Sequence, residues 1–424
     1  MKAKKIAASI ALSTLLIGGL LSGTPAVKSN TNVSYAQTAP ELDQASKKIM
    51  KEAKELGIYD ENKSFQEISS DIALYYQAIQ LGLEVEGKTF EQIYDETWTL
   101  AEEMQREEAE VLGIYTTGKS YEDLSIIIEA EYNKRELELA QVFGIDTSDP
   151  SLAIIKVQNQ LQAIGLGIDV KGKSYEELEK EVSTTLEKKS IEHAEQLGID
   201  TKSLSWQDIN KKITLQDPEF VKTMTIAWLE MVKQSDVIKE ALSLGIEMTG
   251  KSIDEISEAI TIYYQAIGLG VDVDGKSIDQ ITEEAWKLAE EGTIKEAKEL
   301  GINTKGKSYD ELWVLIDKAY DEKALEIANE LGVDTSKEYG IVSDVHTILQ
   351  AQSLDLQTKG KTMEELSELV QSEFVNRSFI RAIELGINVE NMSWQEVNKK
   401  IILQDPTFVN DMTGEYIELL KNFE

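Results

Sequence analysis

The feature that most constrains this chain is an internal repeat, because the sequence superposes on itself without a gap after a shift of 188 residues. Residues 205–221 and 393–409 are identical at 13 of their 17 positions. Similarity at such a fixed offset predicts that one structural unit occurs twice. We therefore expect two tandem copies, at 41–234 and 235–424, preceded by a short lead-in at 37–40.

Each copy contains a shorter repeat of the form A-x-x-L-G-I-x-x-x-G-K-S-x-x-E-L. Glycine adopts a positive φ at little cost, so Leu-Gly followed by Ile predicts a helix C-terminus closed by a Schellman motif. Asp355 stands where the pattern expects one such glycine. The glycines that follow Leu or Phe in this way are Gly57, Gly82, Gly113, Gly144, Gly167, Gly198, Gly245, Gly270, Gly301, Gly332 and Gly386.

Helix starts are marked as clearly as helix ends. About eight residues after the Leu-Gly pair, a Ser or Thr precedes an acid or Gln by three positions, which is the pattern of a capping box. Asp217-Pro218 and Asp405-Pro406 predict two further starts, each with an N-cap aspartate and a proline at the first helical position. The capping pairs are Ser64/Glu67, Thr89/Gln92, Ser120/Asp123, Ser174/Glu177, Ser205/Asp208, Ser252/Glu255, Ser277/Gln280, Ser308/Glu311, Thr362/Glu365 and Ser393/Glu396.

These signals predict an all-α protein. Apolar residues recur at helical spacing between the caps, and no alternating strand pattern of useful length occurs. Most repeat steps are 31 residues, which leaves helices of about 22 residues, and the shorter steps leave helices of roughly 16. We expect seven or eight helices per copy. Each unit is too short to bury its apolar face alone, so the helices should stack as an array or bundle.

The N-terminus has the pattern of a secretory signal peptide. Lys2, Lys4 and Lys5 precede an apolar run that begins at Ile6, and small-residue cleavage sites follow. We favour cleavage after Ala36, which makes residues 1–36 the signal peptide; a site after Ala26 and a retained membrane anchor are the alternatives. No later stretch is apolar enough to span a bilayer. The expected location is therefore secreted or cell-surface.

Composition restricts the partners. Residues 1–36 hold four of the 43 basic residues and no acid, so the remaining chain has a formal charge of −38. Such a charge argues against nucleic acid or an anionic membrane surface as a partner. The chain has no Cys, which excludes disulfides, Cys-ligated metals and a cysteine nucleophile. An exported protein without disulfides suits a Gram-positive bacterium.

The P-loop pattern G-x-x-x-x-G-K-[ST] occurs six times, yet we do not interpret it as a nucleotide site. A P-loop joins a strand to a helix, whereas here the first glycine is expected to end a helix and the Ser or Thr to cap the next one. Acids in the first helical turn would also repel a phosphate. Six copies favour a structural connector. The matches start at Gly82, Gly113, Gly167, Gly245, Gly270 and Gly301.

No residue stands out as catalytic or metal-ligating, and we expect no cofactor. Asp272, Asp274 and Gly275 resemble part of an EF-hand, but Ile281 occupies the position of the required glutamate, so only weak surface calcium binding remains open. His193 and His346 are not equivalent under the 188-residue shift and are expected to be ordinary helix residues. A secreted hydrolase, whose acids the sequence does not single out, is the least favoured function.

Aromatic residues at or near the connectors are the best candidates for a binding surface. They could stack on sugars or anchor a protein interface, although they could equally fix each helix start to its neighbour. We therefore predict a binding or scaffold module for a protein or an envelope component. A carbohydrate or cell-wall binding module is the alternative. The surface residues that we single out are Trp206, Trp394, Tyr121, Tyr175 and Tyr309.

Overall fold

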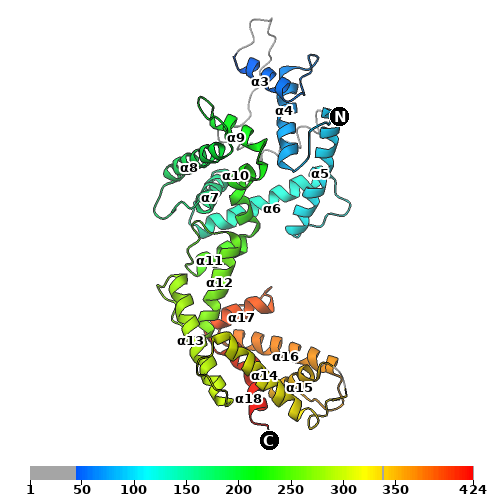
Figure 1. The fold of residues 1–424 in the computed structure, drawn as a ribbon, viewed down its shortest axis with the longest axis vertical. Coiled ribbons are helices and arrows are strands. Elements are labelled where there is room, and N and C mark those ends of the chain that lie inside the picture. The colour runs from blue at the N-terminus through cyan, green and yellow to red at the C-terminus, as the bar shows by residue number, and fades with distance from the viewer. Residues whose placement is uncertain (1–43, 337–338, 424) are drawn as a thin grey trace. The chain divides into compact units, whose positions relative to one another are not determined.

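The computed structural model describes residues 44–336 and 339–423, so the predicted signal peptide and lead-in lie outside it (Figure 1). Every regular element in the described part is an α-helix, which confirms the all-α prediction. The first eight helices are α3 (Gln44–Glu55), α4 (Phe65–Gln80), α5 (Phe90–Val111), α6 (Tyr121–Val142), α7 (Pro150–Gly165), α8 (Tyr175–Gln196), α9 (Trp206–Thr214) and α10 (Pro218–Lys233). The remaining helices are α11 (Ser235–Ser243), α12 (Ile253–Gly268), α13 (Ile278–Glu299), α14 (Tyr309–Ile327), α15 (Ile341–Ser353), α16 (Met363–Glu384), α17 (Trp394–Ile402) and α18 (Phe408–Lys421).

The helix lengths follow the spacing of the repeat. Helices α5, α6, α8, α13 and α16 each contain 22 residues. Helices α4, α7, α10 and α12 each contain 16. Both lengths were expected from the distance between a helix start signal and the next Leu-Gly pair, so local sequence decides where these helices begin and end.

The helix ends have the predicted geometry. At the end of α5, Gly113 has a φ of +73°, its N–H donates to the carbonyl of Glu110, and the N–H of Ile114 donates to that of Ala109. This is the hydrogen-bond pattern of a Schellman motif. Asp355 takes the same left-handed conformation, with a φ of +59°, in place of the expected glycine. Aspartate is one of the few residues that tolerate this region.

The helix starts are equally regular. Before α14, the N–H of Ser308 donates to Glu311 Oε2 at 2.7 Å, and the N–H of Glu311 donates to Ser308 Oγ at 3.2 Å. Hydrogen bonds from the backbone and side chain of Ser308 lower the pKa of Glu311. The two reciprocal bonds satisfy N–H groups that the helix itself cannot use.

In the connectors that contain Lys88, Lys173 and Lys276, the lysine forms an ion pair with an acid of the helix that follows. Lys88 Nζ lies 2.5 Å from Glu96 Oε2, and Lys173 Nζ lies 2.6 Å from Glu181 Oε2. In both pairs the acid is eight residues after the lysine, about two helical turns into the helix. The connectors therefore join helix to helix, which is not the strand-to-helix geometry of a P-loop.

One predicted helix start is wrong. α10 begins at Pro218 as expected, because Asp217 Oδ1 accepts a hydrogen bond from the N–H of Phe220. α18 begins at Phe408 instead of at the equivalent proline, and it has no side-chain N-cap. Arg381 donates from both Nε and Nη2 to Asp405 Oδ2, at 2.8 and 2.6 Å, where unit 1 has His193 Nε2 at 2.9 Å from Asp217 Oδ2. Asp217 still caps α10 through Oδ1, so these contacts do not explain the later start of α18.

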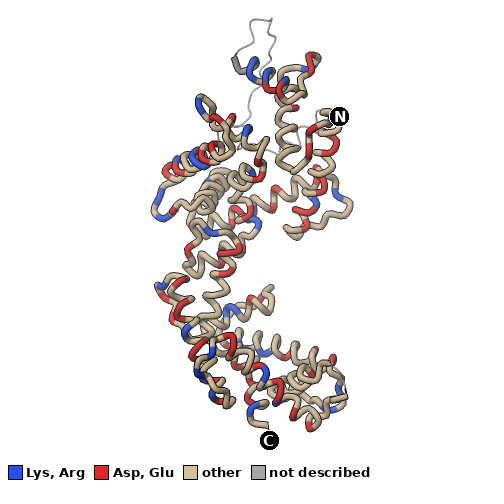
Figure 2. The backbone as a smooth tube through the Cα atoms, in the orientation of Figure 1, with Lys and Arg blue, Asp and Glu red and all other residues tan. Residues whose placement is uncertain are grey.

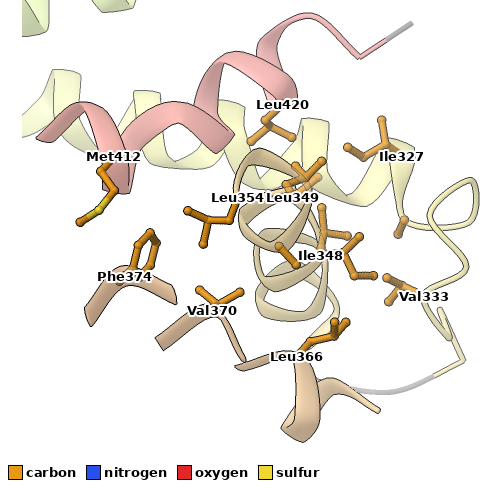
Figure 3. Close-up of a cluster of buried hydrophobic side chains, with 14 residues drawn as sticks. Ile327, Val333, Ile348, Leu349, Leu354, Leu366, Val370, Phe374, Met412 and Leu420 are labelled. Carbon is orange, nitrogen blue, oxygen red and sulfur yellow. The ribbon is translucent and has the colours of Figure 1, made fainter. Parts of the chain in front are cut away.

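The described residues form two compact units, which we call unit 1 (44–256) and unit 2 (257–423). In unit 2, a core of buried apolar side chains lies among α14, α15, α16 and α18. Figure 3 shows Leu349 from α15 and Leu354 just beyond it, with Phe374 from α16 and Leu420 from α18 around them. The boundary between the units falls within α12, whereas the sequence repeat divides the chain at residue 234. The difference arises because α11 packs against α6 of unit 1.

Candidate functional site

Three aromatic side chains of unit 2 form a cluster on α13 and α14. Trp286 lies in the middle of α13, and Tyr309 is the first residue of α14, directly after the capping Ser308. The ring centroids of Trp286 and Tyr309 are 5.4 Å apart, at an interplanar angle of 72°. Trp313, one turn further along α14, lies 6.2 Å from Tyr309 at 68°. These edge-to-face contacts hold the three rings together.

The cluster is open to solvent. Trp286 is 59% exposed and Trp313 is 48% exposed, while Tyr309 lies partly buried between them. Exposed acids, Glu283 and Asp317, lie one turn from these tryptophans on the same helices. Tryptophan and tyrosine are enriched in protein interfaces, so this exposed cluster is a candidate binding surface.

The equivalent positions in unit 1 carry a different arrangement. Trp98 lies 5.6 Å from Tyr121 at 74°, and Tyr94 adds a third ring at 6.1 Å. Ser125 occupies the position equivalent to Trp313 and accepts a hydrogen bond of 2.6 Å from Gln105 Nε2. Trp98 is only partly exposed, and its indole N–H is buried without a partner among the described residues. Burial raises the pKa of Tyr121. The unit 1 cluster is thus more enclosed.

The two tryptophans singled out from the sequence fix helix starts to the helix before them. The indole N–H of Trp206 donates to Ser190 Oγ at 3.0 Å, and that of Trp394 donates to Ser378 Oγ at 2.9 Å. Both rings are partly buried, and Trp394 packs against the core of unit 2. Their contacts are those of packing elements at the first residue of a helix.

Only one of the five sequence candidates belongs to the exposed cluster. Tyr175 lies at the start of α8 in unit 1, where its hydroxyl donates to Glu179 at 3.4 Å. Burial raises its pKa, with Glu179 contributing. The structure joins Tyr309 to two tryptophans that sequence reasoning did not select. Trp313 could have been found from its position one turn after Tyr309, whereas the contact with Trp286 joins two helices and needed the structure.

The two histidines lie in different surroundings. His193 Nε2 lies 2.9 Å from Asp217 Oδ2, and its ring stacks on Phe220 with centroids 3.7 Å apart and planes 9° apart. His346 lies on α15 near Tyr416, and burial lowers its pKa. Neither histidine contacts a Ser or Thr hydroxyl in a nucleophile–base geometry among the contacts of the described residues.

One acid has a strongly shifted pKa. Glu136 on α6 is 2% exposed, and burial raises its pKa to about 7 although Gln158 Nε2 donates to it at 2.8 Å. Its hydrogen-bond partner is an amide instead of a second carboxylate, so the contact does not form the pair of acids that glycoside hydrolysis requires.

The open depression along α13, of about 490 Å³, is lined by Glu291, Ile294, Lys295, Lys298 and Glu299 from a single helix.

Within the described part of the chain, no group of three or more His, Cys, Asp or Glu side chains is arranged to hold a metal ion. None of the described helices combines the length and the hydropathy that crossing a bilayer requires. Comparison with protein-family models, with curated protein sequences and with solved structures gave no match.

Proposed function

We propose that this protein is a secreted or cell-surface binding and scaffold module, built from two copies of one helical unit, for a protein or envelope component. The observation that carries the proposal is the exposed cluster of Trp286, Tyr309 and Trp313. Residues 1–36 would be the signal peptide. The copies would extend over 41–234 and 235–424.

The duplication is supported by contacts that recur 188 residues apart. Tyr132 donates its hydroxyl to Glu108 in unit 1, and Tyr320 donates to Glu296 at 2.6 Å in unit 2. Each of these glutamates also lies near the lysine that ends the last helix of its copy. Lys233 lies 3.4 Å from Glu108, and Lys421 lies 3.9 Å from Glu296. Equivalent residues thus form equivalent tyrosine–acid–lysine networks.

The binding role is supported by the energy that an exposed tryptophan can supply. Covering the free parts of Trp286 and Trp313 would remove a large apolar area from water without reordering the protein, because both rings are already fixed by Tyr309. Interface hot spots are enriched in tryptophan and tyrosine, and truncating one costs about 2 kcal/mol or more. We expect this cluster to be the energetic centre of the interface.

The test is binding of the chain from Gln37 onward to a Gram-positive cell-envelope fraction. The double variant Trp286→Ala/Trp313→Ala should bind at least about thirtyfold more weakly than the unsubstituted chain, since about 2 kcal/mol corresponds to that factor. Ile383→Ala is the matched control, because Ile383 is 63% exposed on α16 and lies outside the cluster. Equal binding by the double variant and the control would contradict the proposal.

The same rings favour carbohydrate binding as a second candidate, because an exposed tryptophan face can also stack on a sugar. The two functions separate when the envelope fraction is treated with protease before the assay. Binding that depends on Trp286 and Trp313 and disappears after proteolysis supports a protein partner. Binding that survives proteolysis and is competed by soluble wall glycan supports the carbohydrate module.

A further inference from the structure

The contact between α6 and α11 joins the first copy to the beginning of the second. Lys239 on α11 forms an ion pair with Glu138 on α6. The N–H of Gly250, just before α12, donates to the carbonyl of Ile164 near the end of α7 at 2.8 Å. All of these residues belong to unit 1. The start of one copy therefore docks on the α6–α7 face of the copy before it.

The helix equivalent to α11 at the head of the chain is α3, and the face that would dock is exposed. On α11, Ser235 is 2% exposed and Ile238 is fully buried. The equivalent residues of α3 are Lys47, which is exposed, and Met50, which is only partly buried. Lys51 of α3 is equivalent to Lys239, and its side chain is 77% exposed.

The helix equivalent to α6 in the second copy is α14, and its matching face is also exposed. Leu137 and Glu138 of α6 are partly buried where α11 packs. The equivalent residues of α14, Leu325 and Glu326, are both exposed, and 47% of Leu325 is accessible to solvent. Each helix of the α6–α11 contact thus has an equivalent helix whose matching face is more exposed within the described part of the chain.

The two helices that bear these faces carry opposite charge. Helix α3 has four lysines against two glutamates, in a chain that is otherwise strongly acidic. The second half of α14, from Asp321, continues with Glu322 and Glu326 against one lysine. Figure 2 shows the concentration of lysines on α3. Opposite charges on two surfaces of one acidic molecule favour their association across molecules.

We propose that this protein associates head to tail with further copies of itself, with α3 of one molecule docking on α14 of the next as α11 docks on α6. The proposal rests on the duplication proposed above and goes beyond the binding function of the aromatic cluster. Lys51 of one molecule pairs with Glu326 of the next. The two faces differ, so the contact is heterologous and extends to further molecules, as a ring or as an open chain.

Two substitutions distinguish the intermolecular contact from the internal one. Inside unit 1, Gly167 and Gly250 lie close together. At the positions 188 residues away, which would meet across the intermolecular contact, the chain has Asp355 in place of Gly167 and Asn62 in place of Gly250. The Asn62 amide can donate to a carboxylate, so these polar residues can meet across the contact without the close backbone approach that the glycines allow. The intermolecular contact is consequently looser, and association is expected to be reversible.

The experiment is sedimentation velocity of the chain from Gln37 onward, from low to high micromolar concentration. The expected result is a sedimentation coefficient that rises continuously with concentration, without a limit at the dimer. Lys51→Glu and Glu326→Lys should each weaken association about tenfold or more, because reversal turns an attraction into a repulsion. The double variant Lys51→Glu/Glu326→Lys restores opposite charges and should recover association.

The matched control is Lys180→Glu/Glu368→Lys, which exchanges the same charges at exposed positions of α8 and α16. It should associate like the unsubstituted chain, as should Trp286→Ala/Trp313→Ala, so failure of self-association and failure of the aromatic site are separable. A monomer at every concentration would overturn the proposal. Association that neither single reversal weakens, or a double variant no better than the single ones, would overturn it as well.

Discussion

Replacing Glu136 with glutamine should stabilise unit 1 at neutral and alkaline pH. Glu136 is 2% exposed on α6, and its pKa is raised to about 7 by burial. Above that pH the folded protein holds a buried carboxylate whose contact with Gln158 supplies no opposite charge. Glutamine has almost the same shape and keeps a polar group beside the Gln158 amide, while it removes the charge.

The magnitude follows from the shift in pKa. The ordinary glutamate value is 4.5, and a rise to about 7 corresponds to ~3 kcal/mol. The folded protein binds this proton more tightly than the unfolded chain does. The stability contributed by Glu136 is therefore highest below pH 4.5, falls as the pH rises towards 7, and stays low above it. Glu136→Gln should have little effect near pH 4.5 and raise stability by up to ~3 kcal/mol at pH 8.

Calorimetric thermal unfolding between pH 4.5 and 8 measures this difference. For a unit of this size, ~3 kcal/mol corresponds to a rise in Tm of roughly 6–12 °C. Glu368→Gln, at an exposed position of α16, is the control and should change Tm little at any pH. A gain for Glu136→Gln of equal size at pH 5 and pH 8, or a loss at pH 8, would refute the reasoning.

Two further substitutions test contacts that recur in both units. Ser378→Ala removes the acceptor of the Trp394 indole N–H, so chemical denaturation should show that the free energy of unfolding falls by about 1–3 kcal/mol. A smaller decrease for Ser378→Thr, which keeps a hydroxyl, would confirm the role of the hydrogen bond. In the variant Arg381→His, the free energy of unfolding of unit 2 should fall by about 1 kcal/mol as the pH rises from 5.5 to 8, because an imidazole forms an ion pair with Asp405 only while it is protonated. A loss of stability that does not depend on pH would contradict this.

The helix boundaries were predictable because their causes are local. A Leu-Gly pair needs only its own backbone to end a helix, and a Ser with Glu three residues later needs only the first turn to begin one. Ser308 and Gly113 therefore behave in the structure as the sequence indicates. The start of α18 was not predictable in this way. Asp405-Pro406 repeats the local pattern of Asp217-Pro218, yet α10 begins at Pro218 with an aspartate cap and α18 begins at Phe408 without one.

The candidate site was less predictable than the fold for the same reason. Trp206 and Tyr309 both follow a capping serine, so their sequence contexts are alike. Their surroundings differ, since Trp206 donates to Ser190 and Tyr309 lies against Trp286. A kink at Ile226 in α10 illustrates the same limit. Gln162 Nε2 of α7 donates to the carbonyl of Met224, two residues before the kink, at 2.7 Å. The apolar pattern of either helix alone gives no sign of this hydrogen bond between them.

Under the proposed duplication, the differences between equivalent positions bear on how many binding sites each chain carries. Ser125 of unit 1 is bonded to Gln105, whereas its counterpart Trp313 extends an exposed aromatic cluster in unit 2. Two tethered copies of a binding site would give avidity within one chain. An aromatic surface that only unit 2 exposes to this degree would instead supply one site per chain. Under our two proposals, several sites would be brought together by the head-to-tail contact, and avidity would then increase with protein concentration.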